Sequence, residues 1–266
     1  MNTMSKGKWE HTMACEYPEG CSCGASERNR EDNLARQQLA RQNARYKVIH
    51  DLHALHQFID WLPELGTTER YYIVLMARSK YIKGTTCPTA RGSQLRRIVC
   101  NKSAMLSKIQ QLEVPVGTYR DRDGNEISQE ALALYINVNP RCLRKATRNA
   151  TKRLLDMALD PESHCRCDHE VMSSVQRSKS RTCWVCFDID DIEKHPMEDV
   201  SNHVNQEAVS AIETRGGYHL MIDPKQIAPE FKQCCKTFSQ WADVTGDMLS
   251  PLPGCYQGGH VPRLVT

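Results

Sequence analysis

The chain has 266 residues, of which 40% are hydrophobic and 25% charged, so it can bury a core, which excludes wholesale disorder and a collagen-like structure. No run approaches the roughly 18 apolar residues of a transmembrane helix, and the first residues lack the apolar stretch of a secretory signal. The net charge of +3 permits nucleic-acid binding without requiring it. We therefore expect a cytoplasmic protein whose 13 cysteines are reduced.

Residues 1–46 differ in composition from the rest of the chain. They contain few large aliphatic residues, although 26–46 are rich in helix formers. This pattern predicts an N-terminal tail and a helical arm that contribute little to the core. We expect the compact fold to occupy residues 47–266.

The segment 47–160 is predicted to be an α/β unit. An amphipathic pattern over His50–Leu62 predicts a helix, and the apolar run Tyr71–Ala77 predicts a strand buried on both faces. Gln94–Leu112 can form a second helix, and Ala131–Val138 is a second strand candidate.

A basic helix is predicted from Pro140 to about Leu159, with Asn139 as its cap. No acidic residue occurs from 139 to 155. At helical spacing, one face carries the cations Arg141, Arg144, Lys145, Arg148 and Lys152. Such a face is either simply solvated or contacts a phosphate backbone.

The segment 182–266 has a different order of elements. Thr182–Phe187 reads as a strand, Ala208–Glu213 and Tyr218–Ile222 as a hairpin, and Pro229–Ala242 as a helix. This order is α+β and is close to a ferredoxin-like or RNA-recognition-type unit.

Two carboxylates follow the first of these strands, in WVCFDIDD. Residues two apart on a strand project from the same face, so Asp188 and Asp190 should point together. Carboxylate oxygens are the ligands that hard divalent cations such as Mg²⁺ prefer. The alternative is a solvated turn where the strand ends.

The hairpin ETRGGYHLMI adds further polar groups. His219 lies in an otherwise apolar strand, Gly216 and Gly217 permit close approach, and Arg215 is suited to binding a phosphate. A third carboxylate, Asp243 or Asp247, follows the last helix, and we favour Asp243. The alternatives are an ordinary sheet histidine and aspartates that cap a helix end or a turn.

These residues resemble a known family. A hydrophobic strand with Asp-x-Asp (VCFDID), a small-residue-x-His hairpin (GGYH) and then a separate Asp is the motif order of archaeo-eukaryotic primases and primase-polymerases. LSPLPGCYQGG is similar to the Pro-Gly segment after the third motif in several virus and plasmid members. The resemblance covers about residues 182–260.

The resemblance implies DNA-templated nucleotidyl transfer by one primase-type domain, in which 182–266 is the RNA-recognition-like, metal-binding unit. Asp188, Asp190 and Asp243 (or Asp247) would hold two ions of Mg²⁺ or Mn²⁺. His219, with Arg215, Gly216 and Gly217, would bind the incoming triphosphate. The partners implied are a single-stranded DNA template, nucleoside triphosphates and a helicase or accessory replication subunit, in a bacterial or viral setting.

A dense group of soft ligands lies at His164, Cys165, Cys167 and His169. Such a group indicates either a Zn²⁺ site or a surface loop.

Two other functions remain open from the sequence. A DxDD phosphatase also begins with a hydrophobic strand and two aspartates, but only 76 residues follow Asp190. A primase-like module that binds nucleic acid or a nucleotide without catalysis is the non-enzymatic alternative.

Overall fold

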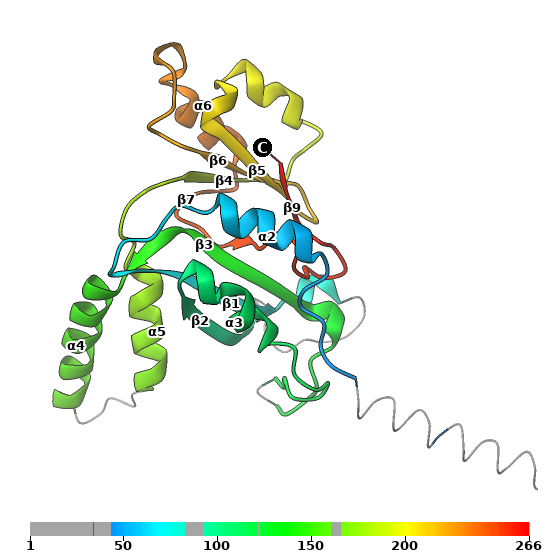
Figure 1. Ribbon diagram of the computed structural model, residues 1–266, viewed down its shortest axis with the longest axis vertical. Coiled ribbons are helices and arrows are strands. Elements are labelled where there is room, and N and C mark those ends of the chain that lie inside the picture. Colours follow the sequence, from blue (N-terminus) through cyan, green and yellow to red (C-terminus); the bar gives the residue numbers. More distant parts are fainter. Residues whose placement is uncertain (1–33, 35–43, 83–92, 122, 161–165, 266) are drawn as a thin grey trace, which may run out of the picture. The chain divides into compact units, whose positions relative to one another are not determined.

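The computed structural model describes residues 34, 44–82, 93–121, 123–160 and 166–265 (Figure 1). From Tyr46 onward the described chain forms one compact unit of mixed α and β structure. The arm predicted within 1–46 falls almost entirely outside the described residues. No described helix has both the length and the apolar character that crossing a membrane requires.

Two antiparallel sheets form the framework. The first has the order β2-β1-β3-β8, with β1 (Glu69–Ala77), β2 (Ser93–Cys100), β3 (Leu132–Cys142) and β8 (Ser250–Pro251). The second has the order β7-β4-β6-β5-β9, with β4 (Val185–Ile189), β5 (Val209–Glu213), β6 (Tyr218–Ile222), β7 (Val244–Gly246) and β9 (Arg263–Val265). The α+β class is therefore confirmed.

Helix α2 (Leu52–Trp61) lies between the two sheets (Figure 1). The side chain of Asp51 caps its first turn by accepting a hydrogen bond from the Ala54 amide. Leu55 and Phe58 pack in one core with residues of both sheets. The predicted amphipathic helix is thus confirmed, and its burial joins the sheets through the hydrophobic effect.

The central strands of the second sheet, β4 and β6, send alternate side chains into two different cores, one on each face of the sheet. Cys186 and Met221 point into the core shared with the first sheet. Phe187 and Leu220 point the other way and pack against Phe238 of helix α6 (Cys234–Trp241). The strands predicted for this half are confirmed within three residues. The helix predicted over Pro229–Ala242 is confirmed only from Cys234, because its first residues, Pro229–Phe231, form a short 3-10 helix.

The helix predicted over Gln94–Leu112 is wrong in its first half. That half is strand β2, in which Ile98 and Val99 pair with β1. Helix α3 (Lys102–Gln110) begins only after Asn101, whose side chain accepts from the Ala104 amide. Cross-strand pairing and this cap outweigh the helical pattern of the whole segment.

The start of the basic helix is also predicted wrongly. Pro140 and Arg141 belong to β3, and helix α4 runs from Leu143 to Leu159. Asn139 does not cap it. Its buried side chain instead accepts from the Cys183 and Trp184 amides at 2.7 and 2.9 Å and donates to the Trp184 carbonyl at 2.9 Å. Helix α5 (Cys167–Arg177) packs beside α4, and the pair projects from the sheets (Figure 1).

Arg141 makes a bidentate polar contact between the sheets. Its guanidinium donates to both carboxylate oxygens of Asp247, at 2.6 and 2.7 Å, and only 1% of its side chain is exposed. Asp247 follows β7 of the second sheet, and Asn139 also donates to it at 3.3 Å. The prediction that Arg141 lies on an exposed, phosphate-binding helix face is therefore wrong.

We expect Arg141→Ala to lower the free energy of unfolding by about 3 kcal/mol, because it leaves the partly buried Asp247 carboxylate without its charged partner. Arg144→Ala removes an exposed cation of α4 and should change this free energy by less than about 0.5 kcal/mol. Urea unfolding of both variants, followed by circular dichroism, measures the difference. Equal losses in the two variants would contradict a stabilising role of the pair.

Candidate active site

Asp188 and His219 are directly opposite each other on β4 and β6. His219 Nε2 lies 3.1 Å from Asp188 Oδ1, and His219 Nδ1 lies 3.1 Å from the hydroxyl of Ser250. The imidazole is only 7% exposed. Because Nε2 faces a carboxylate, it carries a proton, and the Ser250 hydroxyl is the partner of the other nitrogen. Both ring nitrogens of His219 are therefore engaged.

The hairpin turn is held close to the end of β4. A Cβ on Gly217 would lie 2.0 Å from the carbonyl oxygen of Ile189, so only glycine fits there. The Thr214 hydroxyl accepts from the Gly216 and Gly217 amides at 3.4 and 3.2 Å. The two glycines thus bring the turn against the Asp188–Asp190 segment.

Asp188 and Asp190 face one cavity and have opposite pKa shifts. Burial raises the pKa of Asp190, the Asp188 charge raises it further, and Asp243 adds to the shift although Lys80 opposes it. Burial would also raise the pKa of Asp188, but the hydrogen bond and charge of His219, then Lys80 and Arg78, lower it overall. Such divergent shifts are common at functional sites.

The two candidates for a third carboxylate have different surroundings. The Asp243 amide donates to the Asp188 carbonyl at 3.0 Å, and its charge acts on Asp190. Asp247 is instead paired with Arg141. Asp243 is therefore the candidate beside the Asp188–Asp190 pair. As their side chains stand, no three His, Cys, Asp or Glu residues of the described chain are arranged to hold a metal ion.

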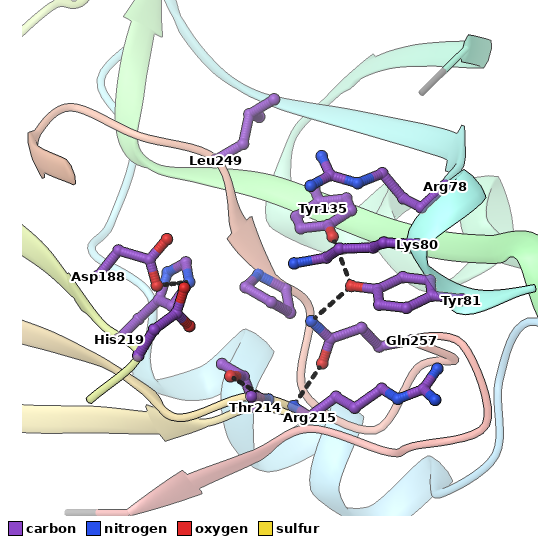
Figure 2. Close-up of a pocket in the computed structure, with 13 residues that line it drawn as sticks. Arg78, Lys80, Tyr81, Tyr135, Asp188, Thr214, Arg215, His219, Leu249 and Gln257 are labelled. Atoms are coloured by element: carbon purple, nitrogen blue, oxygen red, sulfur yellow. Dashed lines mark hydrogen bonds and ion pairs between the residues drawn. The ribbon is translucent and has the colours of Figure 1, made fainter. Parts of the chain in front are cut away.

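The cavity has a volume of about 330 Å³ and is lined by both sheets. Asp188 and His219 line one side, and Arg78 and Lys80 line the other (Figure 2). Asp190, two residues after Asp188, also lines the cavity. Neither cation has a carboxylate within ion-pair distance among the described residues. An acidic wall thus faces a basic wall across one small space.

Arg78 and Lys80 are not among the site residues predicted from the sequence. Both directly follow β1, and Lys80 lies in a short 3-10 helix over Ser79–Tyr81. The available signal was Arg-Ser-Lys immediately after the apolar run that forms β1. Polar residues at the end of a buried strand often line a site, because the strand fixes their position.

Arg215 and Gly216 also line the cavity, whereas Gly217 does not line it and lies against the Ile189 backbone. The Arg215 guanidinium, however, donates to the Gly258 carbonyl and lies 5.0 Å from the centre of the Tyr81 ring. Figure 2 shows this side chain pointing away from Asp188 and His219. Its guanidinium is therefore occupied by contacts within the protein.

The remaining cations of the basic helix are all exposed. Arg144, Lys145, Arg148 and Lys152 lie on the solvent side of α4, whose Ala146 and Ala150 are buried. They form one exposed positive surface, which we call the α4 basic face.

Half of the candidate zinc group can be placed. Cys167 and His169 lie exposed in the first turn of α5, and His169 Nδ1 is 3.4 Å from the Ser173 hydroxyl. His164 and Cys165 lie outside the described residues. The zinc site remains a prediction.

We expect Gly217→Ala to lower the free energy of unfolding by about 1–3 kcal/mol, because its Cβ would collide with the Ile189 backbone. Gly216→Ala is the matched control. Its Cβ would lie 3.4 Å from a carboxylate oxygen of Asp190, a side chain that can move, so we expect a change below about 0.5 kcal/mol. Urea unfolding of the two variants tests this. Equal stability would show that the close contact between Gly217 and the Ile189 backbone is not required for folding.

Comparison of the chain with protein-family models, with curated proteins and with solved structures finds no match.

Proposed function

We propose that this protein is a DNA-templated nucleotidyltransferase of the primase or primase-polymerase type, which synthesises or extends primers. One observation carries the proposal. Asp188, Asp190 and His219, from two strands and a turn, line a single cavity that Arg78 and Lys80 also line, and neither cation forms an ion pair with another described residue. This arrangement suits a triphosphate that is bound together with divalent cations, because both signs of charge are needed.

The order of strands around the site supports the same function. In chain order, β4, β5, β6 and β7 are arranged as β7-β4-β6-β5, with α6 between β6 and β7. An antiparallel sheet in this order is typical of ferredoxin-like and RNA-recognition-type units. It also argues against the phosphatase alternative, which implies a doubly wound parallel sheet.

The carboxylates fit Mg²⁺ or Mn²⁺. Their oxygens are the donors that hard cations prefer, and a cation would offset the burial and the Asp188 charge that together raise the pKa of Asp190. Asp188 and Asp190 would hold the ions, with Asp243 as the third ligand. Bound there, the ions would activate a primer 3′-hydroxyl and stabilise the leaving pyrophosphate.

The protein's own groups would have distinct tasks. His219 is engaged at both nitrogens, so we assign it to positioning Asp188, rather than to the direct triphosphate contact that the family resemblance implies. Lys80 and Arg78 would attract and orient the triphosphate through charge-assisted hydrogen bonds.

The α4 basic face would bind the phosphates of a single-stranded template. Contacts of this kind give affinity that depends on salt and not on sequence. A helicase or an accessory replication subunit would complete the system, as the resemblance implies.

We expect Asp188→Asn with Asp190→Asn to reduce nucleotide incorporation by about 10³-fold, because the charges that hold the ions are removed. Asp191→Asn is the matched control, since it makes the same chemical change beside the site at a residue that does not line the cavity. Extension of a labelled primer on single-stranded DNA with Mg²⁺ or Mn²⁺ measures both variants, and melting temperatures verify folding.

Three results would contradict the proposal. Incorporation that survives in the double variant would exclude these carboxylates from catalysis. If the wild type incorporates no nucleotide on any single-stranded template, the protein is a binding module. Release of phosphate from a simple phosphomonoester would favour a phosphatase.

Replacement of Arg144, Arg148 and Lys152 by alanine should weaken binding of single-stranded DNA and reduce the slope of log affinity against log salt by about 2. Lys225, Lys232 and Lys236, near α6, provide a control triple alanine variant with the same loss of charge. Fluorescence anisotropy at several salt concentrations measures both slopes. Equal effects of the two triple variants would mean that binding depends only on net charge and that DNA does not bind specifically to the α4 basic face.

A further inference from the structure

A chain of hydrogen bonds crosses the wall of the cavity opposite His219 (Figure 2). The Arg215 amide donates to Gln257 Oε1 at 3.1 Å, and Gln257 Nε2 is 3.2 Å from the Tyr81 hydroxyl. The Tyr81 and Tyr135 hydroxyls are 3.1 Å apart. Tyr81, Tyr135 and Gln257 are each less than 10% exposed, yet all three line the cavity.

The donor and the acceptor in each of these hydrogen bonds follow from the number of hydrogens that the groups carry. A backbone amide only donates, so it fixes the Gln257 side chain with its oxygen toward Arg215 and its NH₂ toward Tyr81. The Tyr81 oxygen therefore accepts from Gln257. The two tyrosines have two hydroxyl hydrogens, and only one of them can lie between the two oxygens. The other has no acceptor within the part of the chain that the structure describes.

The hydroxyl pair therefore keeps one donor hydrogen and two acceptor lone pairs for an occupant of the cavity, whichever tyrosine donates to the other. Burial raises the pKa of Tyr135, and the charge and hydrogen bond of Tyr81 raise it further, so this hydroxyl stays protonated at neutral pH.

The tyrosine rings are not open platforms for stacking a base. Arg215 and Lys80 lie 5.0 and 5.6 Å from the centre of the Tyr81 ring, and Arg78 lies 5.7 Å from that of Tyr135. A Cβ on Gly258 would lie 2.3 Å from the Tyr81 ring, so the ring is also held from behind. The hydroxyls are therefore the parts of these residues suited to contact an occupant.

We propose that the Tyr81–Tyr135 hydroxyl pair binds a sugar hydroxyl of the nucleoside triphosphate, and so selects the sugar. This inference rests on the proposed function. A sugar hydroxyl both donates and accepts, which matches the pair. A phosphate oxygen only accepts, and Arg78 and Lys80 on the same side already provide cations for it.

The test is binding of nucleoside triphosphates and their 2′-deoxy and 3′-deoxy analogues, in all four bases, measured by calorimetry with Ca²⁺ to prevent turnover. We expect the wild type to bind at least one deoxy analogue about three- to tenfold more weakly than the ribonucleotide. Tyr81→Phe with Tyr135→Phe should abolish this preference. Tyr72→Phe is the matched control, because its buried hydroxyl has no hydrogen-bond partner among the described residues.

Other results overturn the inference in distinguishable ways. If the wild type binds all the analogues equally, the pair recognises no sugar hydroxyl. If the double variant loses affinity for every nucleotide to the same extent, the pair contacts the phosphates instead. If no nucleoside triphosphate binds the wild type, the proposed function fails and this inference fails with it.

Discussion

The cavity depends on the contact that fixes one sheet against the other. Its basic wall and tyrosines come from the first sheet or follow it, and its carboxylates and histidine belong to the second. Arg141 and Asn139, at the end of β3, bind Asp247 after β7 and the backbone before β4. A bidentate pair buried at this junction allows little sliding, because movement would leave charges without partners. The spacing of the two cavity walls thus depends on Arg141 and Asn139, which do not themselves line the cavity.

The site holds carboxylates on one wall and cations on the other, although the net charge of the whole chain is only +3. Asp190 is held near a second carboxylate at an electrostatic cost, and Arg78 and Lys80 have no carboxylate within ion-pair distance among the residues that the structure describes. A folded chain would gain stability by pairing these groups directly. Their separation across an open space is therefore a cost of folding that a bound ligand carrying both charges would recover.

Local patterns predicted the acidic wall but not the basic wall. The strand ending in Asp188 and the hairpin with His219 are continuous segments whose alternation and glycines are visible in the sequence, so each could be predicted as a local element. Arg141 could not be interpreted correctly, because its partner lies 106 positions away. Arg78 and Lys80 were missed because they become part of a site only when two sheets face each other. Strand β2 was mistaken for a helix, since its pairing with β1 is not a local property.

The path of the chain through β8 and β9 has a consequence for how the protein is made. Residues 250–251 add a strand to the first sheet and 263–265 add one to the second, so each sheet is completed only after its other strands have been synthesised. Gln257 must reach back 176 positions to Tyr81, and closing so long a loop is slow. During translation, Asp188 and His219 leave the ribosome before Ser250 and Gln257 exist. A chain that stops before residue 250 therefore contains Asp188 and His219 but lacks Pro251 and Gln257, which line the cavity.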